Sequence, residues 1–200
     1  MTTYYKSLTY NIVWRATEIC RRMELTTTDK DERLALRIAE LSFTFMTIEA
    51  ALNHLGLRLR PDIFGDDVRE RNCFNGREEI GGQKYYGIMG KLKFIYDCCE
   101  ITYDESSPDI LFVRQLKNFR DLISHGKTEE KNIPYPSKKG ETPDMVTPEL
   151  WQIVSSNLVD ECHTRVKGLI ERLFSHAKKI NPDVESLAFG GSFYQRTTIE

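Results

Sequence analysis

Hydrophobic residues recur at intervals of three and four along much of the chain, which is the spacing of one face of an α-helix. The clearest stretch lies between Asp29 and Gly56. Its apolar positions are Leu34, Ile38, Leu41, Phe45, Ile48, Leu52 and Leu55. Asp29 and Glu32 have capping-box spacing, and Gly56 is a typical residue at a helix end. The pattern predicts a central, broadly apolar helix of about 25 residues.

Four other stretches also predict helices. Residues 7–23 carry apolar positions at Leu8, Ile12, Trp14, Ile19 and Met23, and residues 85–103 at Ile88, Leu92, Ile95 and Cys99. A third helix begins with Ser107 as N-cap and Pro108 at the first position, carries Phe112, Leu116, Phe119 and Ile123, and ends at Gly126. A fourth begins at Thr147 and Pro148 and carries Leu150, Val154, Leu158, Cys162, Val166, Leu169, Ile170 and Leu173.

Residues 58–84 and 127–147 lose this periodicity and predict two long loops. No stretch alternates convincingly with a period of two, so no strand is expected. The chain therefore predicts an all-α bundle of four or five helices. We expect a single domain over residues 1–180 and a weakly ordered tail over residues 181–200.

Composition narrows the class of protein. The net charge of 200 residues is only −2, so any nucleic-acid binding has to depend on a local patch. Five cysteines without C-x-x-C spacing favour reduced thiols in a cytoplasmic protein over disulfides or a zinc site. Neither a signal peptide nor an apolar run long enough for a membrane span is expected. No metal-site or nucleotide-loop motif is present, so neither a metal nor another cofactor is expected.

Arg120 and His125 are the candidate catalytic pair, at the end of the predicted helix that stops at Gly126. A neutral imidazole can accept the 2′-hydroxyl proton of RNA, and a guanidinium can stabilise charge that builds on the phosphate. Such a reaction needs no metal and leaves a 2′,3′-cyclic phosphate and a 5′-hydroxyl. On an ideal helix, however, positions five apart point about 140° away from each other.

Two interpretations of the pair therefore stay open at this point. Seven lysines and arginines but only three acidic residues lie between Arg114 and Lys139, which favours an RNA-binding surface. The same pattern is also typical of a helix end complemented by cations and followed by a solvated lysine loop. For the catalytic interpretation, the helix has to loosen before Gly126, or two subunits have to bring two copies together.

At these residues the sequence resembles the HEPN superfamily, whose signature is an Arg, usually a polar residue, and a His after four to six intervening positions. Here the corresponding stretch is "RDLISHG", residues 120–126. Members are bundles of four or five helices, and many are metal-independent ribonucleases that act as toxins of toxin–antitoxin pairs or in antiviral defence. They typically dimerise so that two motifs face one cleft.

The resemblance implies roles for individual residues. His125 would be the general base or acid, Arg120 would hold the scissile phosphate, and Asp121, where the family often has Asn, would orient one of them. The further candidates for RNA contacts are Lys127, Lys117, Arg114 and Asn118. The implied partners are RNA, a second copy of the chain, and an antitoxin or other defence protein. The alternative is a non-catalytic HEPN-like module for dimerisation, protein or nucleotide binding.

Overall fold

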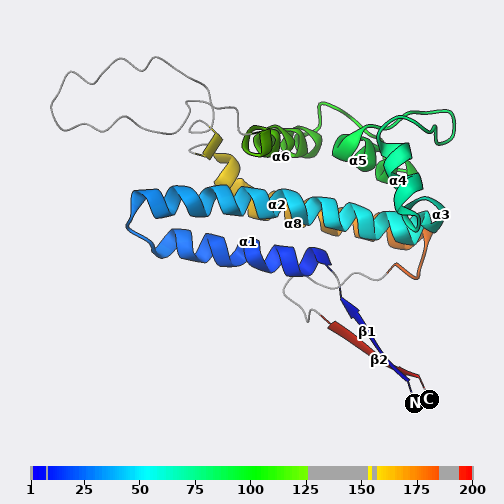
Figure 1. Cartoon of the computed structure of the whole chain (residues 1–200), viewed down its shortest axis with the longest axis horizontal. Helices are drawn as coiled ribbons and strands as arrows, with labels where there is room; N and C mark the ends of the chain where they lie inside the picture. The colour runs from blue at the N-terminus through cyan, green and yellow to red at the C-terminus, as the bar shows by residue number, and fades with distance from the viewer. Residues whose placement is uncertain (1, 8, 126–152, 155–156, 185–193, 200) are drawn as a thin grey trace.

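The protein is mostly helical, and its helices pack around one long central helix (Figure 1). The computed structural model describes residues 2–7, 9–125, 153–154, 157–184 and 194–199, with side chains for residues 9–124, 153–154 and 157–184. The helices are α1 (Thr9–Thr26), α2 (Lys30–Leu59), α3 (Pro61–Phe64), α4 (Asp67–Phe74), α5 (Gly87–Cys98), α6 (Pro108–His125) and α8 (Asn157–Ile180).

Helix α2 is the central helix, as its apolar pattern predicts. It contacts α1, α3, α5, α6 and α8. Figure 1 shows α1 running back along α2 as a helical hairpin, with α8 behind and α5 and α6 on the other side. The core residues Leu41, Leu52 and Leu55 are completely buried. Because every other major helix packs on α2, its sequence carries apolar residues around most of its circumference.

The start of α2 confirms the predicted cap, but its predicted end is wrong. The Asp29 carboxylate accepts hydrogen bonds from the backbone N–H groups of Asp31 and Glu32, at 2.9 and 2.8 Å. The helix continues past Gly56 to Leu59. Gly56 is buried inside the helix because the Phe64 ring packs on it, where a Cβ would lie 2.4 Å from the ring. The glycine therefore serves close packing rather than a helix end.

Residues 58–84 are not the predicted loop, because they contain α3 and α4. Pro61 stands at the first position of α3, and Asp66 caps α4 by accepting from the N–H groups of Val68 and Arg69. These helices bury Ile63, Phe64, Cys73 and Phe74. They have four and eight residues. Helices this short leave too few turns for a periodic hydrophobic pattern to be recognised.

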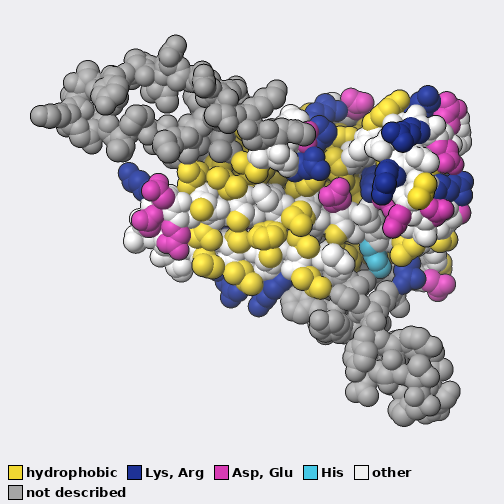
Figure 2. Space-filling model, viewed as in Figure 1, with side chains coloured by type: hydrophobic (Ala, Val, Ile, Leu, Met, Phe, Trp, Pro, Cys, Tyr) yellow, Lys and Arg dark blue, Asp and Glu magenta, His cyan; other side chains and the backbone are white. Residues whose placement is uncertain are grey.

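The predicted apolar stripe on the first helix is wrong for most of its members. Helix α1 buries Trp14 but leaves Ile12, Ile19 and Met23 largely exposed. It instead turns a partly polar face to the bundle, made of Tyr10, Asn11, Trp14, Thr17, Cys20 and Glu24. Figure 2 shows the resulting hydrophobic surface along α1 and α2, whereas charged side chains gather at the end formed by α3, α4 and α5.

The remaining apolar stripes are largely confirmed. Ile88, Leu92 and Ile95 of α5 are buried, and so is Cys99, which follows the helix. Also buried are Phe112, Leu116 and Phe119 of α6, and Cys162, Val166, Leu169, Ile170 and Leu173 of α8. Ile123 is exposed. The predicted loop 127–147, the stop at Gly126, and the start at Thr147, Pro148 and Leu150 lie outside the described residues.

Two strands that the pattern does not predict join the chain ends. Strand β1 (Thr2–Ser7) pairs antiparallel with β2 (Tyr194–Ile199), so that Thr2 lies opposite Ile199 and Ser7 opposite Tyr194. Strand β2 falls in the segment expected to be a weakly ordered tail. Its residue types favour strands, but neither set of alternate positions is consistently apolar. The pairing joins segments from opposite ends of the sequence, which local periodicity cannot reveal.

Candidate functional site

Helix α6 positions the candidate site on its solvent-facing side. Its start is as predicted, with Pro108 first and the Ile110 N–H donating to the Ser107 hydroxyl at 3.4 Å. Phe119 is completely buried against the bundle. Its neighbour Arg120 keeps 47% of its side chain exposed. The helix thus presents Arg120 at the surface while Phe119 anchors the same turn in the core.

Asp121 connects two cations of the site. Arg120 donates from Nη1 to one carboxylate oxygen at 3.0 Å, and Lys117 donates from Nζ to the other at 2.6 Å. The hydrogen bond from Lys117, together with that from Arg120, lowers the pKa of Asp121 below its ordinary value of 3.8. Asp121 is therefore a carboxylate at neutral pH and accepts both hydrogen bonds.

Arg120 also lies against α2, at the edge of a cavity. Its guanidinium carbon lies 5.6 Å from the centre of the Phe45 ring, within the range of a cation–π contact. The cavity holds about 270 Å³ and is lined by Ser42, Phe45, Met46, Glu49, Arg120, Ile123 and Ser124. Phe45 and Asp121 together hold the guanidinium on two sides, and its other N–H groups form no hydrogen bond within the described residues. They are free to bind an anion such as a phosphate.

The other half of the predicted pair is placed only by its backbone. His125 is the last residue of α6, and its side chain lies outside the described residues, as does Lys127. The helix stays α-helical through His125, so an early loosening does not bring the two positions together. Around the helix axis, positions 120 and 125 stay about 140° apart. Whether His125 and Arg120 act together therefore remains a prediction.

The remaining RNA-contact candidates lie beside Asp121 on α6. Arg114, Lys117, Asn118 and Asp121 are spaced as neighbours on one helix face. Arg114 forms an ion pair with Glu105 at 3.1 Å, and Lys117 forms one with Asp121. Asn118 is exposed. Lys117 shares the Asp121 carboxylate with Arg120, so these three cations and two carboxylates leave one positive charge, and the further lysines lie after residue 126, outside the described residues.

The α2 side of the cavity was missed by sequence reasoning. Ser42, Phe45, Met46 and Glu49 line it at helical spacing. The apolar periodicity predicts Phe45 only as a core residue, and it is indeed buried. Nothing in the local pattern of α2 shows that α6 crosses it at these residues. Met46 and Ile123 are exposed apolar side chains on the two walls, with 47% and 38% of their surface accessible.

Two kinds of feature are not found among the described residues. Among them, no three His, Cys, Asp or Glu side chains gather closely enough to hold a metal ion. Within the same residues, no helix combines the length and the apolar character of a membrane span. Comparison of the chain with protein-family models, curated proteins and solved structures finds no match.

Proposed function

We propose that the protein is a metal-independent endoribonuclease of the HEPN type, in which Arg120 binds the scissile phosphate and His125 moves the proton of the 2′-hydroxyl. The observation that carries the proposal is the placement of Arg120. Its guanidinium is oriented by Asp121 and Phe45 at the edge of a cavity, five positions before a His at the end of the same helix. Cleavage would leave a 2′,3′-cyclic phosphate and a 5′-hydroxyl end.

The geometry of α6 favours a site shared by two copies. Within one straight helix, Arg120 and His125 point about 140° apart, so one copy alone does not direct both at one phosphate. The exposed Met46 and Ile123 beside Arg120 are apolar side chains that a second copy would cover. We therefore propose a homodimer in which Arg120 of one copy acts with His125 of the other. An antitoxin or another defence protein would be its natural regulator.

The first test is cleavage of RNA by the purified full chain in EDTA. We expect products with 2′,3′-cyclic phosphate and 5′-hydroxyl ends. Arg120→Ala removes a hydrogen-bond donor to the phosphate in the transition state, so the rate of RNA cleavage is expected to fall about 10²–10³-fold. His125→Ala removes the proton acceptor and is expected to cost about 10²–10⁴-fold. Arg165→Ala is the matched control, because Arg165 is a partly exposed arginine on α8 that, like Arg120, pairs with a neighbouring carboxylate, that of Glu161.

A mixing experiment separates the shared site from a site within one copy. Arg120→Ala and His125→Ala proteins are mixed under conditions that exchange subunits. If each site combines residues of two copies, half of the dimers carry one intact site, and about a quarter of the wild-type rate returns. Without such recovery the shared site is wrong. If the wild-type protein cleaves no RNA, or if His125→Ala cleaves as fast, the ribonuclease proposal fails.

The second candidate function is a non-catalytic helical module that binds a partner. The observation that favours it is that Arg120 already has two structural contacts, Asp121 and Phe45, which would hold it in place without any substrate. Under this hypothesis Arg120→Ala lowers the free energy of unfolding while no RNA is cut by either protein. Growth arrest on expression in cells, lost in His125→Ala, would exclude it.

A further inference from the structure

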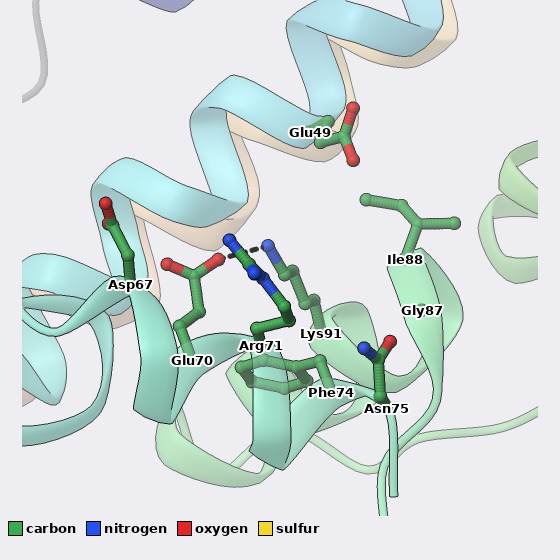
Figure 3. A pocket seen from close by; sticks show the side chains of 9 residues that line it. All are labelled: Glu49, Asp67, Glu70, Arg71, Phe74, Asn75, Gly87, Ile88 and Lys91. Atoms are coloured by element: carbon green, nitrogen blue, oxygen red, sulfur yellow. Dashed lines mark hydrogen bonds and ion pairs between the residues drawn. The ribbon is translucent and has the colours of Figure 1, made fainter.

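A second cavity lies at the charged end of the molecule, between α2, α4 and α5. It holds about 360 Å³, within the range of small-molecule sites. Figure 3 shows Glu49 entering from α2, Asp67, Glu70 and Arg71 from α4, and Lys91 from α5. The ring of Phe74 forms part of its wall. Residues far apart in the sequence thus form one polar cavity, and no sequence motif marks it.

One ion pair in this cavity is already complete. Lys91 forms a salt bridge with Glu70 and donates a hydrogen bond to the Asn53 side chain at 2.8 Å. Its ammonium also lies 5.5 Å from the centre of the Phe74 ring. The side chains of Lys91 and Glu70 keep only 14% and 20% of their surface exposed. This pair is therefore a fixed part of the cavity wall, and neither charge needs a ligand.

Three other charges in the cavity have no partner. Within the described residues, no hydrogen bond or ion pair is formed by the side chain of half-buried Glu49, nor by those of Asp67 and Arg71, which are exposed. With the Lys91–Glu70 pair neutral, the unpaired groups are two carboxylates and one guanidinium, so the lining carries a net charge of −1. Such a lining repels a polyanion such as RNA and favours a ligand that brings an anion and more than one cation.

We propose that this cavity binds a small zwitterion with one additional positive charge, which is the chemistry of a dibasic amino acid. The ligand carboxylate pairs with Arg71, whose planar guanidinium matches a carboxylate with two hydrogen bonds. The two cationic groups of the ligand pair with Glu49 and Asp67. The proposal is independent of the ribonuclease proposal, although Glu49 also lines the cavity beside Arg120.

Calorimetric titration of the full chain with four probes tests the proposal. L-Arginine and L-lysine carry all three charged groups. Agmatine lacks the carboxylate, and L-citrulline lacks the side-chain charge. Each missing charge-assisted contact is expected to weaken binding about tenfold or more. We therefore expect L-arginine and L-lysine to bind more tightly than agmatine and L-citrulline by at least that factor.

Variants of the chain assign each contact. Arg71→Ala is expected to weaken the binding of L-arginine about tenfold or more, and not to weaken the binding of agmatine. Glu49→Gln and Asp67→Asn are expected to weaken the binding of both L-arginine and agmatine. None of the three side chains has a partner within the described residues, so the variants should fold. Arg77→Ala, an exposed arginine outside the lining, is the matched control.

Two results would overturn the proposal. The first is the absence of binding by both L-arginine and L-lysine at millimolar concentration. The second is binding that Arg71→Ala leaves as strong as in the wild type. Neither outcome depends on RNA cleavage, because titration is carried out without RNA. Failure here therefore leaves the ribonuclease proposal standing, and an inactive ribonuclease leaves this one standing.

Discussion

Replacing Gly56 by alanine tests the packing of α3 on the central helix. The new Cβ would lie 2.4 Å from two carbons of the Phe64 ring, far inside van der Waals contact. The ring cannot move away freely because it is buried and lies 5.3 Å from the Phe74 ring, centre to centre. Gly56→Ala therefore has to displace either the ring or α3 itself.

The expected magnitude follows from two opposing effects. Overpacking a filled core costs roughly 1–3 kcal/mol. Alanine in place of glycine within a helix stabilises the folded state by about 0.5–1 kcal/mol. The net loss in the free energy of unfolding should be up to about 2.5 kcal/mol, which lowers the Tm of a chain this size by up to roughly 10 °C. Urea unfolding followed by far-ultraviolet circular dichroism measures the same difference directly.

Two further variants make the result decisive. Gly168 of α8 is an exposed helical glycine whose Cβ would meet no atom within 4 Å. Gly168→Ala should therefore raise the free energy of unfolding by about 0.5–1 kcal/mol. In a Phe64→Leu background, where the ring is absent, Gly56→Ala should lower the free energy of unfolding much less. If both glycine variants stabilise the protein alike, or if the Phe64→Leu background makes no difference, the packing argument is refuted.

Three other substitutions have defined outcomes. Burial raises the pKa of Glu40, which is 1% exposed, above its ordinary value of 4.5. Ionisation of Glu40 therefore lowers the free energy of unfolding as the pH rises above that value. Glu40→Gln should be more stable than the wild type near pH 7 but not at pH 4, as measured by urea unfolding at each pH. Asp29→Ala removes the cap of α2 and should lower the free energy of unfolding by about 1 kcal/mol. Asp31→Ala removes a neighbouring carboxylate without that role and should lower it much less. Equal losses would refute the role of Asp29 as the cap. Asp121→Asn should keep the fold but slow RNA cleavage less than Arg120→Ala does, because Asn can still accept one hydrogen bond from the guanidinium; a fully inactive Asp121→Asn would contradict an orienting role.

The candidate site was only partly predictable from sequence. The sequence marks Arg120, Asp121 and His125 because the motif lies within seven consecutive residues. It does not mark Phe45 or Glu49 as part of the site. Their place beside Arg120 results from the packing of α6 on α2, which brings Phe45 next to Arg120, 75 positions further along the chain. The cavity around Arg71 and Lys91 was missed for a second reason, since it depends on the short helix α4, which has no periodic pattern of its own.

The sequence alone determined those features whose physics is local. The long apolar repeats predict α2, α5, α6 and α8, and the caps at Asp29 and Ser107 mark where two helices begin, because side chain and backbone within a few residues decide both. Only the tertiary structure decided which face of a helix packs against the bundle, because the faces of one helix compete for the same buried position. Helix α1 carries one apolar stripe through Ile12 and Ile19 and a mixed face through Trp14. Packing selected the mixed face, since Trp14 buries a large ring against the His163 ring at 4.3 Å.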